Sequence, residues 1–303
     1  MPTPLELRDA DDATWAVYAD ELLSRGDSRG ELIHLQLGKR EPGLVQRERE
    51  LLKSDERLGG ARQLLASLDA TWRRGFLSRV RSPRAVALQV LLKHPSGALL
   101  DELVLDNPNV ALDELVDAVG ASLHKGLRSL VIRSDDSGVR FEREVGLGSV
   151  LALPGLRRLE AVVRELSVGV RAKRESGIQR LELSARTIPL SQLAAWSFPK
   201  LTELDLSVFS SVTRLYWTGA VDQPQEWPIL DLPPRFASSE MAPALESLTL
   251  SSWIIDGVSA QQLAQLLDRC ATLKRVDLTR CRLDEQALNR LQLVGSRVAL
   301  ASR

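Results

Sequence analysis

The chain has 303 residues, of which 44% are apolar and 26% charged, values typical of a soluble globular protein with one large or two ordinary domains. Its 40 Lys and Arg residues balance its 40 Asp and Glu residues. This zero net charge argues against a general nucleic-acid binder, which needs surplus cations to displace counterions. No apolar run in the sequence approaches the roughly 20 residues of a membrane helix, and the acidic N-terminus lacks the build of a signal peptide. We therefore expect a cytoplasmic protein, and a cysteine content limited to Cys270 and Cys281 fits a reducing compartment.

Residues 1–72 are predicted to form a small all-α module. Apolar residues at spacings of three and four indicate a first helix over Asp11–Arg25, which Gly26 would end. Ser28 and Glu31 have the spacing of a capping box at the start of a second helix. A charged third helix over 44–58 and a fourth over 61–72 complete the expected module.

Three polar side chains of this module suggest an alternative with chemistry. Glu31 and His34 share one helix face as an E-x-x-H pair, the spacing found in di-iron carboxylate bundles, and Asp20 lies on the helix before them. Such centres need a second E-x-x-H pair, which the sequence does not contain. We favour a structural polar role for these residues, with a metal-binding or enzyme-associated module as the alternative.

A family resemblance covers the same part of the chain. The stretch VYADELLSRGDSRGELIHLQLG, from Val17 to Gly38, and the later WRRGFLSRVRS, from Trp72 to Ser82, resemble the bacterial repeat-companion domain. That family usually stands directly before leucine-rich repeats. The resemblance implies a bacterial helical module coupled to repeats, and it implies no activity or cofactor.

The remainder, residues 73–303, carries a recurring apolar pattern. The stretch LKRVDLTRCRL, Leu273–Leu283, fits the leucine-rich-repeat template at every fixed position. About eight or nine irregular repeats follow from the same frame, starting at Leu77, Leu100, Leu127, Leu156, Ile178, Leu201, Trp227, Leu245 and Leu273. Because one repeat cannot bury its own apolar face, successive strands should stack. The predicted fold is α/β: a leucine-rich-repeat solenoid with a curved parallel sheet and a helical or irregular convex side, after the all-α module.

Outward positions of these strands are the predicted partner-binding surface. The fourth position after each repeat start is rich in carboxylates, which should form an acidic row on the concave face; those singled out are Glu160, Glu182, Asp205, Asp231 and Asp277. Arginines two residues earlier would offset part of this charge. Solvated charge is also common on exposed strand faces. The acidic row is therefore either a partner-binding surface or ordinary surface charge, and both interpretations stay open.

The irregular segment 207–244 is a second candidate surface. It is rich in aromatic residues and proline and is either a distorted repeat or an inserted hairpin. Tyr216 and Trp217 lie inside it, and Trp253 follows at the frame position normally held by Asn or Cys. We include these three aromatics among the predicted partner contacts because Tyr and Trp dominate binding hot spots.

A basic stretch marks the junction between module and repeats. It contains Arg73, Arg74, Arg79, Arg81 and Arg84 and extends to Lys93 without any acidic residue. It could neutralise acidic residues of the third helix, or it could serve a nucleic-acid-associated factor, which is our second alternative function.

From these patterns we predict a non-enzymatic scaffold that binds an unidentified protein partner on the concave sheet or the 207–244 segment. We expect no catalytic site, cofactor, metal, small-molecule substrate or membrane contact.

Overall fold

The computed structural model divides the chain into two compact units, Met1–Leu130 and Val131–Arg303. Both units are mixed α/β, and most strand pairings among the described residues are parallel. The structure describes residues 2–38, 41–54, 69–82, 95–106, 126–133, 145–169, 175–209, 227–238, 240–294 and 297–300.

Unit 1 begins with three helices, α1 (Asp12–Ser24), α2 (Arg29–Leu37) and α3 (Pro42–Ser54). The predicted first helix is confirmed: the Asp11 carboxylate caps its N-terminus by accepting from the Thr14 N–H, and Gly26 has the positive φ of 69° expected after a helix end. The predicted capping box at Ser28 is wrong, because its side chain makes no capping bond. Asp27 instead accepts from the backbone N–H of Arg29 at 3.0 Å.

A β-hairpin follows the helices, with strands β1 (Asp69–Arg73) and β2 (Phe76–Ser82) paired antiparallel. The prediction of a fourth helix ending at Trp72 is therefore wrong over 69–72, while 61–68 lie outside the described residues. Arg74 and Gly75 form the two-residue turn, and both have positive φ (51° and 72°), as a type I′ turn requires. A Cβ at Gly75 would lie 2.9 Å from the Arg29 carbonyl oxygen, so this turn needs glycine both for φ and for space.

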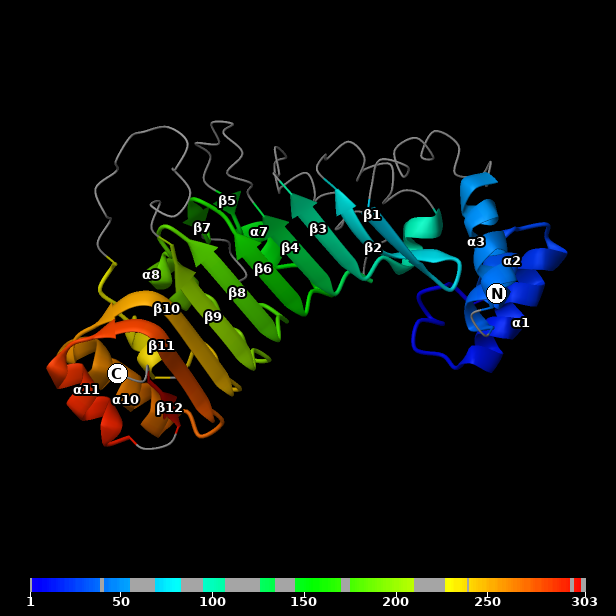
Figure 1. Ribbon diagram of the computed structural model, residues 1–303. Helices are drawn as coiled ribbons and strands as arrows, with labels where there is room; N and C mark the ends of the chain where they lie inside the picture. The colour runs from blue at the N-terminus through cyan, green and yellow to red at the C-terminus, as the bar shows by residue number, and fades with distance from the viewer. Residues whose placement is uncertain are drawn as a thin grey trace, which may run out of the picture. The chain divides into compact units, whose positions relative to one another are not determined.

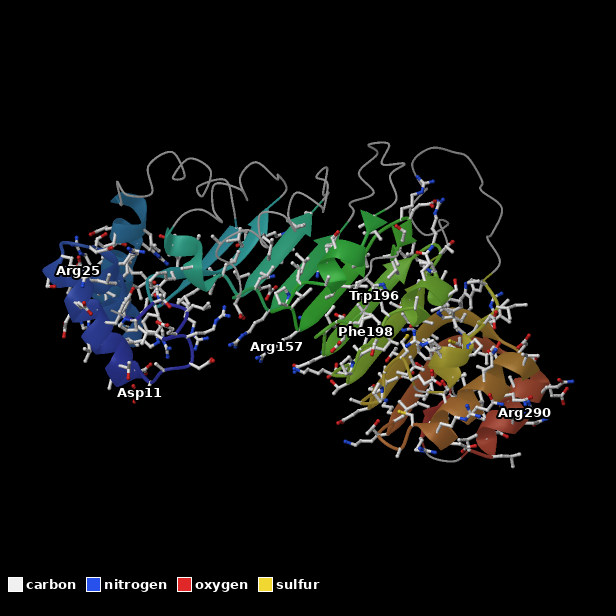
Figure 2. The ribbon with its side chains drawn as sticks, turned by 180° about the vertical axis from the view of Figure 1, so that it is seen from behind. Asp11, Arg25, Arg157, Trp196, Phe198 and Arg290 are labelled. Carbon is white, nitrogen blue, oxygen red and sulfur yellow. The ribbon has the colours of Figure 1, made fainter. Side chains whose placement is uncertain are left out.

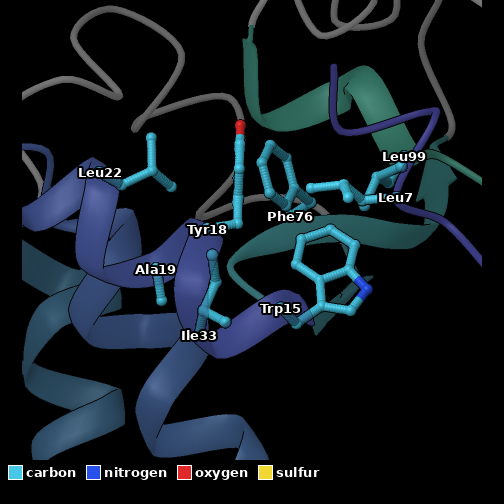
Figure 3. Packing of buried hydrophobic residues seen from close by; sticks show 8 residues of the cluster. All are labelled: Leu7, Trp15, Tyr18, Ala19, Leu22, Ile33, Phe76 and Leu99. Carbon is cyan, nitrogen blue, oxygen red and sulfur yellow. The ribbon is translucent and has the colours of Figure 1, made fainter. Parts of the chain in front are cut away.

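The hairpin shares its hydrophobic core with α1 and α2 (Figure 3). Trp15, Ile33 and Phe76 are fully buried there, and Trp15 packs edge-on against both Tyr18 and Phe76. Arg74 stacks over the Trp15 ring at 5.2 Å, and Gln36 accepts from the Gly75 N–H at 2.8 Å. The predicted boundary between 1–72 and 73–303 stays a prediction, although this core joins residues from both sides of residue 72.

Beyond the hairpin, unit 1 continues with the 3-10 helix η2 (Pro95–Leu99) and β3 (Glu102–Asp106), which pairs parallel with β2. Strand β4 (Ser129–Arg133) falls across the division at Leu130. Val104 and Val131 stand at the fourth position after the repeat starts Leu100 and Leu127, which the repeat frame predicts to face outward, yet both are buried.

Unit 2 contains the principal sheet segment, in the order β6-β8-β9-β10-β11-β12 (Figure 1). Its strands are β6 (Arg158–Val162), β8 (Arg180–Ala185), β9 (Glu203–Val208), β10 (Ser247–Ile255), β11 (Arg275–Leu283) and β12 (Val298–Ala299). Every pairing among them is parallel. A separate parallel pair joins β5 (Val145–Gly146) to β7 (Leu166–Ser167).

The register of these strands stacks the apolar positions into columns. Leu159 pairs with Leu181, which pairs with Leu204 and then Leu248, and a second column runs through Leu183, Leu206 and Leu250. All of these leucines are buried. Because side chains alternate across a strand, the residues between them face the other side of the sheet. The predicted parallel pairing and inward leucine positions are confirmed for these strands.

Helices return the chain between strands, as α7 (Gly148–Leu151), α8 (Leu190–Ala194), α9 (Pro234–Ala237), α10 (Gly257–Arg269) and α11 (Glu285–Gln292). The carboxylates of Asp256 and Asp284 cap α10 and α11 by accepting from the backbone N–H three residues on. After α8, Trp196 and Phe198 are fully buried (Figure 2). Apolar spacing in the sequence predicts helical returns over 189–196, 260–267 and 284–291, which α8, α10 and α11 confirm, and one over 112–123, which lies outside the described residues.

Two equivalent side chains tie consecutive strands together at the turn. The Cys281 Sγ donates to the Leu250 carbonyl oxygen at 3.2 Å, and the Trp253 Nε1 donates to the Leu206 carbonyl oxygen at 3.0 Å. Both donors occupy the same position of the repeat frame, and both acceptors do as well. The indole therefore takes the role that Asn or Cys has in the template.

Candidate partner-binding surface

The exposed face of the unit 2 sheet carries three rows of polar side chains in register. The middle row runs Glu160, Glu182, Asp205, Thr249 and Asp277 across neighbouring strands. The row before it runs Arg158, Arg180, Glu203, Ser247 and Arg275, and the row after it includes Ser184, Ser207 and Ser251. The predicted acidic row therefore exists, with a neutral Thr249 between Asp205 and Asp277.

Arginines hold most of these carboxylates within the face. Arg158 Nη2 donates to Glu160 at 3.0 Å and to Glu182 at 3.2 Å. Arg180 Nε donates to Glu182 at 2.6 Å, and its Nη1 lies 3.1 Å from Glu203. Arg133, which the sequence did not single out, donates to Glu160 at 2.9 Å. Because Glu160, Glu182 and Asp277 each have an arginine at hydrogen-bond distance, most of the repulsion expected along a row of like charges is offset.

Asp205 differs from its neighbours in the row. It accepts a hydrogen bond from the Ser207 hydroxyl at 2.9 Å and forms no ion pair with any residue that the structure describes. Burial raises the pKa of its carboxyl, and the nearby charge of Glu182 adds to this, against the attraction of Arg180 and Arg280. Asp205 is thus a half-buried carboxylate whose charged form is poorly compensated within the chain.

Asp277 shows the opposite balance at the same frame position. Burial alone would raise the pKa of its carboxyl, but hydrogen bonds from the Thr279 hydroxyl and N–H and from Arg275 outweigh it, so the pKa is lowered. The Arg275 Nη2 donates to Asp277 at 2.7 Å. Two differences accompany this contrast: Asp277 accepts two hydrogen bonds from Thr279 where Asp205 accepts one from Ser207, and the residue two places earlier is arginine on β11 and glutamate on β9.

Two predicted contact residues lie elsewhere. Asp231 is not a member of the row, because β10 pairs directly with β9 and Asp205 faces Thr249. Among the described residues, the predicted repeat that starts at Trp227 contributes a single bridge, Ile229 to Ile254, and Asp231 accepts from Gln262 at 3.1 Å. Trp253 is only 4% exposed and supports the turn, so it is absent from the exposed face.

The structure describes only part of the 207–244 segment. Tyr216 and Trp217 lie outside the described residues, and their predicted role stays untested. Trp227 lies beneath Arg282, whose guanidinium carbon is 4.5 Å from the ring centre, and Ile229, two residues further along the chain, is 58% exposed.

The basic junction is largely neutralised within unit 1. Arg74 pairs with Asp12 at 2.9 Å, Arg79 with Glu102 at 3.1 Å, and Arg81 with Asp106. These carboxylates belong to the first helix and to β3, whereas the sequence suggested the third helix. Arg73 is exposed on β1, and Arg84 and Lys93 lie outside the described residues.

The E-x-x-H pair is divided between two partners. Glu31 accepts from Arg47 at 2.7 and 3.1 Å, while His34 lies 2.8 Å from Asp20. Within the described part of the chain, no group of three or more His, Cys, Asp or Glu side chains is arranged to hold a metal ion. Among the described helices, none has the length and apolar character needed to cross a membrane.

Burial raises the pKa of the Cys281 thiol to about 11, with the charge of Asp277 adding to it against a backbone hydrogen bond at Trp253. A thiol with this pKa is poorly suited to act as a nucleophile, since the thiolate is the reactive form. Its hydrogen bond to Leu250 gives it a structural role.

Comparison with known proteins gives limited likeness. No protein-family model and no curated protein matches the chain. A solved protein from Bacteroides fragilis is similar with a TM-score of 0.38 and 16% identity, over 66% of this chain and 65% of that one, which is less than two thirds of its length. An internalin from Listeria monocytogenes is similar with a TM-score of 0.30 and 14% identity, over 71% of this chain and 70% of that one.

Proposed function

We propose that the chain is a non-enzymatic scaffold that binds a protein partner on the exposed face of the unit 2 sheet. The observation that carries this proposal is a polar face three rows deep. Side chains at its margin remain open to solvent: Arg275 is 65% and Glu203 52% exposed. A rigid sheet that repeats its strands in register presents such groups at fixed spacings, which favours recognition of a folded or extended protein surface.

The wider assignment is part of the same proposal. We infer a leucine-rich-repeat solenoid that follows a bacterial repeat-companion module and acts in the cytoplasm. The stacked leucine columns and the Trp253 and Cys281 turn bonds support the repeat assignment. The metal-binding and nucleic-acid alternatives gain no support from the described residues, because Glu31 is ion-paired with Arg47 and three of the named arginines have acidic partners.

Affinity capture with the full chain tests the proposal. Proteins retained from lysate of the source cells are quantified for the wild-type chain, for a double variant Glu182→Lys/Asp205→Lys, and for Asp268→Lys. Asp268 is exposed on α10 and provides a matched charge reversal away from the face. We expect the double variant to lose the retained partner by roughly tenfold or more, as for central interface residues, and the Asp268 variant to keep it.

Equal capture by all three proteins, with unfolding curves unchanged, would exclude the sheet face. If Trp227→Ala alone removed the partner, the binding surface would instead be the 207–244 segment.

A further inference from the structure

The arginine–carboxylate pattern of the unit 2 face is interrupted at its centre. On β6, β8 and β11, an arginine stands two residues before the acid of the middle row, as Arg158, Arg180 and Arg275. On β9 the same position is Glu203, and on β10 the two positions are Ser247 and Thr249. The centre of the face therefore has acids or hydroxyls where the flanking strands supply cations.

The local charge balance follows directly. The face positions of β8, Arg180 and Glu182, sum to zero. Those of β9, Glu203 and Asp205, sum to −2, and those of β10 sum to zero because they are Ser247 and Thr249. Arg180 serves both Glu182 and Glu203, so no further bond from it reaches Asp205 among the interactions of the described residues.

Hydroxyl groups beside Asp205 remain open as well. Thr249 is its lateral neighbour on β10, and Ser184 and Ser251 flank the Ser207 that bonds it. The hydroxyls of Ser184, Thr249 and Ser251 make no side-chain hydrogen bond within the described residues. Short Ser and Thr side chains do not extend over the Asp205 carboxylate as the arginines extend over Glu160 and Glu182.

We propose that Asp205 is the docking point for a basic side chain, preferably arginine, of the protein partner. This inference rests on the proposed function and adds the chemistry of the contact. A guanidinium offers five donors in a planar fork, which can bond the open oxygens of Asp205 and reach the neighbouring hydroxyls. The incoming cation replaces the arginine that the chain omits on β9 and β10.

The raised pKa of Asp205 agrees with this geometry. Arg180 and Arg280 attract the Asp205 carboxylate without forming an ion pair with it, and at such a half-buried carboxylate an added positive charge gains more than at a fully exposed pair. The chain thus keeps an energetically unfavourable group at the middle of its polar face.

The test is selection of phage-displayed random peptides on the full wild-type chain, with the same selection on Asp205→Asn and Asp277→Asn. Asp277→Asn is the matched control because Asp277 is already bound by Arg275. The wild-type and the Asp277 variant should enrich peptides with Arg or Lys about fivefold or more over the unselected pool, the scale of one interfacial charge pair, and Asp205→Asn should lose this enrichment. Absent enrichment, or equal enrichment on Asp205→Asn, overturns the proposal.

A second variant keeps the test independent of folding defects. Thr249→Arg places a guanidinium next to Asp205 from within the chain, so it should abolish enrichment of basic peptides while leaving the unfolding temperature unchanged or higher. Retained enrichment with this variant also overturns the proposal. If peptides without basic residues are selected and are lost in Glu182→Lys/Asp205→Lys, the face still binds protein and only the cation inference fails. If lysate capture is insensitive to that double variant, the proposed function fails.

Discussion

Replacing Trp253 with Phe should destabilise unit 2 without removing partner binding. The substitution deletes the Nε1 donor that bonds the Leu206 carbonyl oxygen at 3.0 Å. Loss of a buried hydrogen bond costs about 0.5–1.5 kcal/mol, and more if the acceptor is left unpaired. The smaller ring also leaves a void in a site that is only 4% exposed, which adds about 1 kcal/mol. We therefore expect a loss of about 1.5–2.5 kcal/mol in the free energy of unfolding.

Urea unfolding followed by far-ultraviolet circular dichroism measures this loss, and hydrogen exchange of the β9 and β10 amides localises it. Trp227→Phe is the matched control, because Trp227 is partly exposed and its cation–π contact with Arg282 is worth about 1 kcal/mol or less. Equal costs for the two substitutions would refute a structural role for Trp253. Loss of capture by Trp253→Phe at unchanged stability would restore it to the binding surface.

Three further predictions follow from the same face and core. Leu204→Ala should cost about 2–5 kcal/mol of unfolding free energy, because the side chain is 2% exposed in the stacked column. Glu203→Ala on the same strand should change the unfolding free energy by about 0.5 kcal/mol or less in the same urea titration, because Glu203 is exposed. The pKa of Asp205 is raised in the folded state, so the native state binds the proton more tightly than the unfolded state does. The wild-type chain therefore loses stability as the pH rises from the ordinary Asp pKa to this raised pKa. Asp205→Asn removes the titrating group and should flatten the pH dependence of stability over that interval. Cys281, with its pKa of about 11, should react with iodoacetamide at pH 8 only as fast as unit 2 opens, and immediate labelling of the native chain would contradict its burial.

The stacked strands of unit 2 were predictable because their signal is local and repeated. Leu204 and Leu206 alternate with polar residues, and the same alternation recurs at a fixed place in each repeat. Each strand can bury its leucines only against its neighbours, so the register follows from the frame. The acids Glu160, Glu182 and Asp205 were placed correctly for the same reason.

The repeat frame gave a wrong prediction where a strand was assumed without an alternating apolar pattern to support it. Trp227 was assigned as a repeat start, which inserted Asp231 into the row, yet β10 pairs with β9 directly. The segment that contains Asp231 bridges only the later part of β10, at Ile254. Trp253 was placed at the right frame position, but its indole was not recognised as the donor that replaces Asn or Cys.

Local turn chemistry explains the errors in unit 1. Apolar spacing over 61–72 favoured a helix, while the Arg74–Gly75 turn requires two residues with positive φ and selects a hairpin. A glycine followed by an alternating stretch was the available signal. Similarly, the Asp27 carboxylate in the preceding turn accepts a hydrogen bond from the backbone N–H of Arg29, which is a cap that the predicted Ser28–Glu31 capping box did not include. Glu31 is instead paired with Arg47.

Asp205 on β9 and Trp253 on the neighbouring strand β10 are expected to differ in role, with Trp253 supporting stability and Asp205 supporting partner binding. Trp253 completes a buried hydrogen bond, so its loss should weaken the fold and leave the surface intact. Asp205 carries a charge that burial disfavours, so its neutral replacement should be tolerated or stabilising at pH 7 while weakening partner binding. This combination of a small or favourable effect on folding and a loss of binding is what the proposed contact with a cation from outside the chain predicts. If Asp205→Asn proved strongly destabilising at pH 7, the carboxylate would be a structural acceptor for Ser207, and the case for a docking point would fail with it.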